Sequence, residues 1–170
     1  MDSALVVWDA INAVFPLAVV LWTAALCTTL YEALAALLLA GLAAVVAVVG
    51  VLKVAVGRGR PDRSDARSFP SGHAAVAAFL AVATGAALIL GHPSGTIKKT
   101  DDSPPGWRVG PTLLSIAAAV AATAAGGARV GASRHHASDV VVGWAIGAAG
   151  GWATWRIGHI NHILLKDQSL

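Results

Sequence analysis

The stretch ALAALLLAGLAAVVAVVGVLKVAV at residues 33–56 decides the class of this protein, because Lys53 is the one charged residue in an otherwise apolar run. A helix needs about 20 consecutive apolar residues to cross a bilayer. We therefore expect residues 33–56 to form a membrane-spanning helix. An ionisable residue near the end of such a helix is costly in lipid and usually functional, which makes Lys53 a candidate site residue.

Further apolar runs, separated by polar segments, extend this prediction to the whole chain. The composition agrees, with 56% hydrophobic and 12% charged residues, where soluble domains carry about 25% charged residues. We expect spans at residues 13–30, 33–56, 72–91, 111–128 and 140–157 and an interfacial amphipathic helix at residues 1–12. The expected fold is all-α: one polytopic membrane helix bundle over residues 1–170, with about five transmembrane helices. An N-terminal extension of the first span is the alternative for residues 1–12.

Charge and cysteine content exclude several classes of function. The formal net charge of +3 comes without a long basic run, so we expect no nucleic-acid partner. Cys27 is the one cysteine, which excludes an intrachain disulfide and a cysteine-type zinc site. We expect no metal and no cofactor. The N-terminus lacks the pattern of a secretory leader, so we expect the first apolar stretch to be retained.

Two polar segments that carry most of the arginines are expected on the same face of the membrane. They are the loop at residues 57–70 and the short connection at residues 129–138. The spans 72–91 and 111–128 separate them, and two crossings return a chain to the face from which it started. Side chains from both segments can therefore meet at one water–lipid boundary, with the loop at residues 92–110 on the other side.

His135 and Asp139 are four residues apart, at the start of the last apolar run. On a helix or turn, that spacing lets the carboxylate reach one ring nitrogen. The carboxylate then fixes the tautomer, and the other nitrogen can attack a phosphorus atom. His136 lies three residues before Asp139, so spacing alone leaves the choice between the two histidines open. In a simpler interpretation, the histidine and aspartate only cap the last helix.

The turn Pro70-Ser71-Gly72-His73 opens the third predicted span. Unpaired N–H groups at a helix N-terminus favour an anion. Gly72 allows close backbone approach, and the Ser71 hydroxyl can cap the helix or donate to a phosphate. His73 is placed to protonate a leaving alkoxide. An ordinary N-cap followed by an exposed histidine is the simpler interpretation.

Lys53, Arg60 and Arg129 supply positive charge on the same predicted face. Arginine binds phosphate oxygens with two parallel hydrogen bonds, and fixed cations stabilise the charge of a phosphoryl transition state. Lys53 alone could be a lysine that extends to the interface. The three cations together, beside two histidines, favour a phosphate site.

These stretches together resemble the type 2 phosphatidic acid phosphatase superfamily. Its members show Lys-x6-Arg-Pro, Pro-Ser-Gly-His and Ser-Arg-x5-His-x3-Asp in this order. Residues 53–61 and 70–73 match the first two motifs in full, and residues 129–139 match the third from its arginine onward. The match selects His135 over His136. Ala128 stands where the family usually has serine, which removes one phosphate donor.

The resemblance implies an integral membrane lipid phosphatase that works through a phosphohistidine intermediate without a metal. It implies His135 as nucleophile, Asp139 as its orienting partner, His73 as general acid, and phosphate binding by Lys53, Arg60, Ser71, Gly72 and Arg129. The implied substrate is a lipid phosphomonoester or diphosphate: phosphatidate, phosphatidylglycerol phosphate or a polyprenyl phosphate. Family members usually have six membrane helices and mostly face outward. We therefore expect the cell membrane and an extracytoplasmic site.

Two other functions compete with this interpretation. Vanadium-dependent haloperoxidases share the phosphate pocket, but they are soluble and much larger than this chain. A non-enzymatic membrane assembly or transport protein, with polar residues lining a path, would leave the motif spacings unexplained.

A stripe of small residues marks the last predicted span. Gly143, Gly147 and Gly151 recur every four residues, a pattern that allows close contact between helices. Packing within the chain is the simpler interpretation, and a homodimer interface is the alternative.

Overall fold

The protein is all-helical over the residues that the structure describes. The computed structural model describes all residues except 1–9, 11–13, 16, 24–31, 90–108 and 168–170, and within this part it contains helices, turns and loops but no strand. The helices are α2 (Glu32–Val56), α3 (Gly72–Ile89), α4 (Val109–Gly131) and α5 (Ala137–Asp167). The expected all-α class is confirmed.

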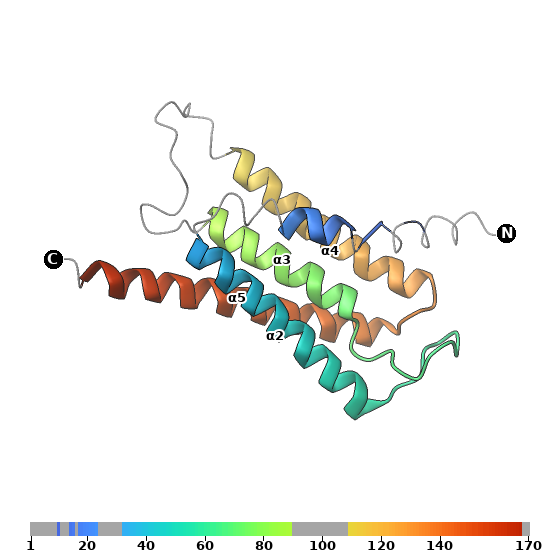
Figure 1. The fold of residues 1–170 in the computed structure, drawn as a ribbon. Coiled ribbons are helices and arrows are strands. Elements are labelled where there is room, and N and C mark those ends of the chain that lie inside the picture. Colours follow the sequence, from blue (N-terminus) through green and yellow to red (C-terminus); the bar gives the residue numbers. More distant parts are fainter. Residues whose placement is uncertain (1–9, 11–13, 16, 24–31, 90–108, 168–170) are drawn as a thin grey trace.

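Helix α3 is the centre of the bundle. It contacts α2, α4 and α5, and its most extensive packing is against α5. Figure 1 shows α3 lying between α2 and α4. Phe79 of α3 is fully buried and packs in a cluster with Val45 and Val49 of α2. The central helix is therefore held by apolar contacts with its neighbours, and its first turn is fixed in position.

Glycines bring the backbones of α3 and α5 into direct contact. A Cβ atom on any glycine of the small-residue stripe would meet a backbone carbonyl oxygen of α3 or of the residue just before it. The glycines are Gly143, Gly147 and Gly151, and the carbonyls belong to Ser71, Ala75 and Phe79, respectively. The stripe is thus used for packing within the chain, which removes this surface as a candidate homodimer interface.

A short N-terminal helical segment packs on the outside of α3. Residues 17–23 are helical, and Val19 and Trp22 contact the apolar cluster around Phe79. The Trp22 indole N–H donates a hydrogen bond to the Thr84 hydroxyl, with 3.1 Å between Nε1 and Oγ1. The expected interfacial helix at residues 1–12 lies outside the described residues, apart from Ala10, which is helical. The second half of the expected span at residues 13–30 lies outside them as well.

Most ends of the observed helices lie close to the ends of the predicted spans. α5 is the main difference, because it continues to Asp167, whereas the apolar run predicted a span that ends near residue 157. The prediction followed the apolar run alone, whereas the helix continues through a more polar segment. Among the described residues, Ala35–Val56 is the one helix long and apolar enough to cross a membrane, and Gly72–Ala87 is a shorter apolar helix. The polytopic arrangement stays a prediction.

The α2–α3 loop and the α4–α5 turn lie at the same end of the bundle (Figure 1). The Asp62 amide donates to the Ser133 carbonyl with an N–O distance of 3.3 Å, and the Arg134 guanidinium pairs with the Asp62 carboxylate at 3.3 Å. Gly57 ends α2 with a positive φ of 58°, and its amide bonds the Lys53 carbonyl. A left-handed glycine is a common helix terminus, and here it turns the chain toward α3.

We expect Gly147→Ala to destabilise the bundle. The new Cβ would collide with the Ala75 carbonyl oxygen and lie 2.9 Å from the Phe79 amide nitrogen. Overpacking of this kind lowers the free energy of unfolding by about 1–3 kcal/mol. Thermal denaturation of the purified protein in detergent measures the loss.

Gly127→Ala is the matched control, because it adds the same methyl group at a helical glycine with no atom within 4 Å of the new Cβ. Alanine favours a helix over glycine by about 1 kcal/mol, so this variant should be at least as stable as the wild type. Equal melting temperatures for the two variants would contradict the close approach of α3 and α5.

Candidate active site

The first turn of α3 presents its backbone toward the polar end of the bundle. Ser71 is fully buried at the N-cap, where its hydroxyl accepts a hydrogen bond from the Ala74 amide at 3.5 Å. The hydroxyl hydrogen remains available to donate. At Gly72 a Cβ would make only ordinary contact with Val49, at 3.6 Å. Packing within the protein does not account for a glycine there, whereas the close approach of an anion to the helix N-terminus would.

His73 is held from two sides by residues of other segments. Arg129 Nη2, at the end of α4, lies 3.1 Å from His73 Nδ1. Because a guanidinium has only donors, Nδ1 is the acceptor, and the neutral ring carries its proton on Nε2. The Phe15 ring lies against the imidazole with 4.7 Å between ring centroids. Nε2 is thus the atom of His73 that can donate to a substrate.

His135 and Asp139 form the buried centre of the site. His135 is 3% exposed and Asp139 is fully buried, and 3.8 Å separates His135 Nδ1 from Asp139 Oδ2. At this distance the two side chains are neighbours without a hydrogen bond, and they form an ion pair only when the ring is protonated. Catalytic hydrogen bonds are often long in ligand-free sites and shorten when substrate binds. Nδ1 faces the carboxylate, so Nε2 is the candidate nucleophilic atom.

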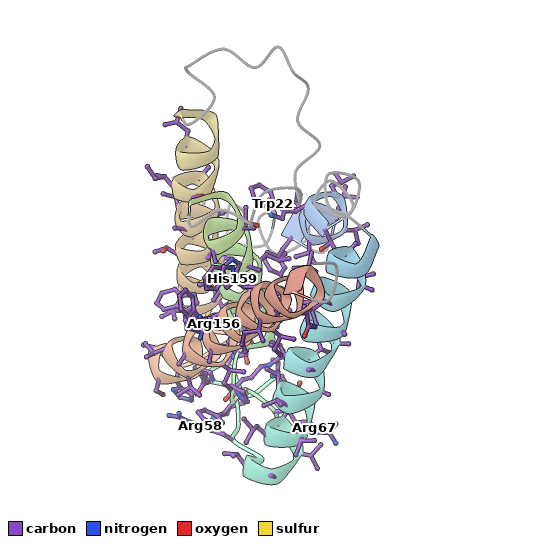
Figure 2. The ribbon with its side chains drawn as sticks, turned by 90° about the vertical axis from the view of Figure 1, so that its left-hand side faces the viewer. Trp22, Arg58, Arg67, Arg156 and His159 are labelled. Atoms are coloured by element: carbon purple, nitrogen blue, oxygen red, sulfur yellow. The ribbon has the colours of Figure 1, made fainter. Side chains whose placement is uncertain are left out.

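Asp139 is engaged by two other partners, which explains the long distance to His135. Its Oδ2 accepts a hydrogen bond from the His136 amide at 3.0 Å, so the side chain also caps α5. Its Oδ1 accepts from Arg58 Nη1 at 2.9 Å. Arg58 is thus a site residue that sequence reasoning missed. It lies in the loop after α2, and Figure 2 shows it at the lower end of the molecule, away from Trp22.

His136, the rival histidine, is placed differently from His135. It is partly exposed, and its Nε2 lies 3.4 Å from the Gly59 carbonyl oxygen. Its ring is therefore turned to the α2–α3 loop, whereas the ring of His135 is enclosed. The selection of His135 over His136, which the family motif implied, stays a prediction.

Lys53 and Arg60 both contact the α2–α3 loop, and they place positive charge near the histidines. Lys53 Nζ donates to the Arg67 carbonyl at 3.1 Å, so the side chain bends over the loop. Arg60 pairs with the Asp65 carboxylate at 3.1 Å and lies 3.4 Å from the Ser64 hydroxyl. Both cations are therefore fixed by local contacts, which suits a preformed anion site.

Several buried polar atoms of the site have no hydrogen-bond partner. They include Arg60 Nε, Arg129 Nε and His135 Nδ1. Buried polar groups are nearly always bonded, and an exception needs an explanation such as a ligand or ion. Two guanidinium donors without partners fit an anion. Among the described residues, no group of three or more His, Cys, Asp or Glu side chains could hold a metal ion.

The environment of His135 favours its neutral form. Burial lowers the pKa of His135 from 6.5 to about 4, and the charges of Arg129 and Lys53 act in the same direction. The Ser68 backbone and the Asp139 carboxylate oppose this shift and are outweighed. At neutral pH the imidazole is therefore uncharged, and an uncharged ring nitrogen is the nucleophilic form.

The structure brings the predicted site residues to one end of the bundle from four helices and two loops. Contacts link His73 to Arg129 and place His135 beside Asp139. Lys53 and Arg60 act on His73 through their charges. Ala128, the position where the family usually has serine, is fully buried. Besides Arg58, sequence reasoning also missed Phe15, because a single aromatic residue in an apolar run does not indicate a site.

The comparisons with known proteins identify the family. The model of the PAP2 superfamily matches residues 34–163, which is more than half of the chain, so the protein belongs to this superfamily. The resemblance stated from the three motifs is confirmed. No curated protein and no solved structure gives a significant match to the chain.

Membership in the PAP2 superfamily defines the coarse function. Its members are generally phosphatases, with haloperoxidase-like activity in the same superfamily. The chain is accordingly a phosphoric ester hydrolase at the level of reaction class, with a phosphorylated substrate.

We expect the His135 ring to stay neutral from pH 7 down to about pH 5, because its pKa is lowered to about 4. Histidine ring nitrogen shifts, followed by NMR in detergent micelles, report the titration, and His135→Gln assigns the signal by its loss. A midpoint near 6.5 would contradict the buried, cation-flanked position of this ring.

The same shift predicts how stability depends on pH. Between pH 6.5 and about 4, the unfolded chain binds a proton at position 135 that the folded chain does not. The free energy of unfolding therefore falls as the pH is lowered through this window, and the contribution levels off below it. Denaturation at several pH values should show a smaller loss in His135→Gln than in the wild type. An equal loss in both proteins is the opposing result.

Proposed function

We propose that the protein is an integral membrane lipid phosphatase that hydrolyses a lipid phosphomonoester or diphosphate through a phosphohistidine intermediate, without a metal. The observation that carries the proposal is the meeting of His73 and His135 with Arg60 and Arg129, whose buried Nε donors have no partner. Such a site suits an anionic group that is attacked on one side and protonated on the other.

His135 begins the reaction. Its Nε2 attacks phosphorus, and the bond from phosphorus to the lipid oxygen breaks as the nitrogen–phosphorus bond forms. Asp139 stabilises the positive charge that develops on the ring. Lys53, Arg60 and Arg129 neutralise the non-bridging oxygens, together with the Ser71 hydroxyl and the Gly72 amide at the start of α3.

His73 moves the protons in both steps. The phosphoryl group draws Arg129 away from His73 Nδ1, and that nitrogen takes up a proton from solvent, which returns to solvent when Arg129 binds Nδ1 again at the end of the cycle. The His73 imidazolium then donates its Nε2 proton to the departing lipid oxygen. In the second step, neutral His73 accepts a proton from water, which attacks the phosphohistidine and releases phosphate and free His135.

Apolar exposure supports the membrane location. Large apolar side chains lie open to the surroundings on three helices of the bundle, and soluble proteins rarely expose such extended apolar surface. They include Leu39, Val46, Val51 and Val54 on α2, Leu113, Ile116 and Val120 on α4, and Trp152, Ile157 and Ile160 on α5. We propose that these faces contact lipid, that the chain forms one membrane-embedded unit, and that the site faces outward from the cell membrane.

The substrate is proposed at the level of a lipid phosphate. Phosphatidate, phosphatidylglycerol phosphate and polyprenyl phosphates or diphosphates all present a phosphoryl group at the headgroup level. A phosphate-release screen with detergent-purified protein compares them directly, and a chelator should leave the rate unchanged. Release from none of these lipids would favour the non-enzymatic alternative.

His135→Ala should lower phosphate release by about 10³-fold or more, because it removes the nucleophile itself. His136→Ala is the matched control and should keep most of the activity, since that ring contacts the Gly59 carbonyl. Release from detergent-dispersed lipid phosphate is measured for both variants, after circular dichroism has shown that each is folded. The opposite ranking would assign the nucleophile to His136.

A further inference from the structure

Arg58 occupies a variable position of the Lys-x6-Arg-Pro motif and yet contacts the centre of the site. Its Nη1 donates to the Ser138 hydroxyl at 2.8 Å and to Asp139 Oδ1 at 2.9 Å. These contacts join the loop after α2 to the first turn of α5, across 81 residues of sequence. The guanidinium thus binds the carboxylate that the mechanism requires, from the side away from His135.

The two oxygens of Asp139 have different partners, which fixes the plane of the carboxylate. Oδ1 is held by Arg58, and Oδ2 is held by the His136 amide and faces His135. Among the described residues, Arg58 is the cation in direct contact with this fully buried carboxylate, since Arg129 contacts His73 instead. The Arg58 side chain is itself 40% exposed, so its removal would leave the buried Asp139 carboxylate without its paired cation.

We propose that Arg58 is a positioning residue, which holds the Asp139 carboxylate toward His135 and leaves the phosphoryl group to the other cations. This inference rests on the proposed function, in which His135 is the nucleophile. It assigns Arg58 an effect on the chemical step and not on substrate affinity.

The charges around His135 give the inference a second observable. Lys53 faces this ring from α2, His73 from α3, Arg129 from α4 and Asp139 from α5. Without Arg58, the negative charge of Asp139 would act on His135 with less compensation. The pKa of His135 should therefore rise from its lowered value.

The kinetic test compares Arg58→Gln with Arg67→Gln. Arg67 is exposed in the same loop, and within the described part of the chain it contacts Lys53 and Asp65 through its backbone and not through its guanidinium. Figure 2 shows the two arginines at the same end of the molecule. Arg58→Gln should lower kcat by about 10- to 100-fold, the range seen when residues that orient metal-bound histidines and carboxylates are lost, with KM nearly unchanged. Arg67→Gln should change neither constant, and Arg58→Lys should recover part of kcat.

A double variant tests whether Arg58 acts through Asp139. If it does, adding Arg58→Gln to Asp139→Asn should cause no further loss of kcat, because the carboxylate that Arg58 holds is already gone. If the losses of kcat in the two single variants multiply in the double variant, Arg58 acts independently of Asp139 and the proposal is overturned. A rise in KM with unchanged kcat would overturn it as well and make Arg58 a phosphate-binding residue.

The ring titration of His135 tests the inference without turnover. NMR of Arg58→Gln should show a higher His135 midpoint than the wild type, whereas Arg67→Gln should not change it. Where Arg58→Gln yields no folded protein, Arg58→Lys should show a smaller shift of the same sign. An unchanged midpoint in the folded Arg58 variant overturns the inference. A wild type that hydrolyses no lipid phosphate would end the proposed function alone, since this titration still decides the role of Arg58.

Discussion

The close approach of α3 and α5 is the constraint on which the site depends. Glycines on α5 let it lie directly against the backbone of α3, and the contact extends to the first turns of both helices. There the Ser71 amide donates to the Asp139 carbonyl with an N–O distance of 2.9 Å. Side chains larger than hydrogen along this contact would separate the two first turns. The turn that carries His73 and the turn that carries Asp139 would then no longer face one anion.

Charge compensation at these two turns is divided between two arginines from different segments. Arg129 contacts the ring of His73, and Arg58 contacts the carboxylate of Asp139. Each histidine of the proposed mechanism is thus linked to a guanidinium, directly for His73 and through a carboxylate for His135. The difference has a chemical consequence: Arg129 can exchange His73 for a phosphate oxygen, whereas Arg58 has a full negative charge to hold it in place.

The sequence predicted the elements and the local pairs, and it did not predict the contacts between distant segments. The apolar run at residues 33–56 predicted α2 to within one residue, because apolarity and length determine such a helix. The spacing of His135 and Asp139 predicted that they would be neighbours on one turn. No periodicity relates Arg58 to Asp139. The loop after α2 contains several other arginines, so the sequence did not single out Arg58. Phe15 reaches His73 only because the N-terminal segment packs against α3 and α4, which is a tertiary property.

In the proposed membrane arrangement, the site would lie at the depth at which a lipid presents its phosphate. Lys53 lies in the last turn of the apolar helix α2, and its ammonium group bends toward the polar loop. In the proposed membrane arrangement, that turn lies where hydrocarbon gives way to headgroups. Apolar side chains such as Val46 on α2 and Val120 on α4 remain open beside the bundle, so the tail of a substrate could stay in lipid while its phosphate meets the histidines. A water-soluble phosphate ester would gain the same polar contacts but none from these faces. The pairing of an apolar flank with an anion site is therefore the physical ground on which we propose a lipid and not a soluble ester as the substrate.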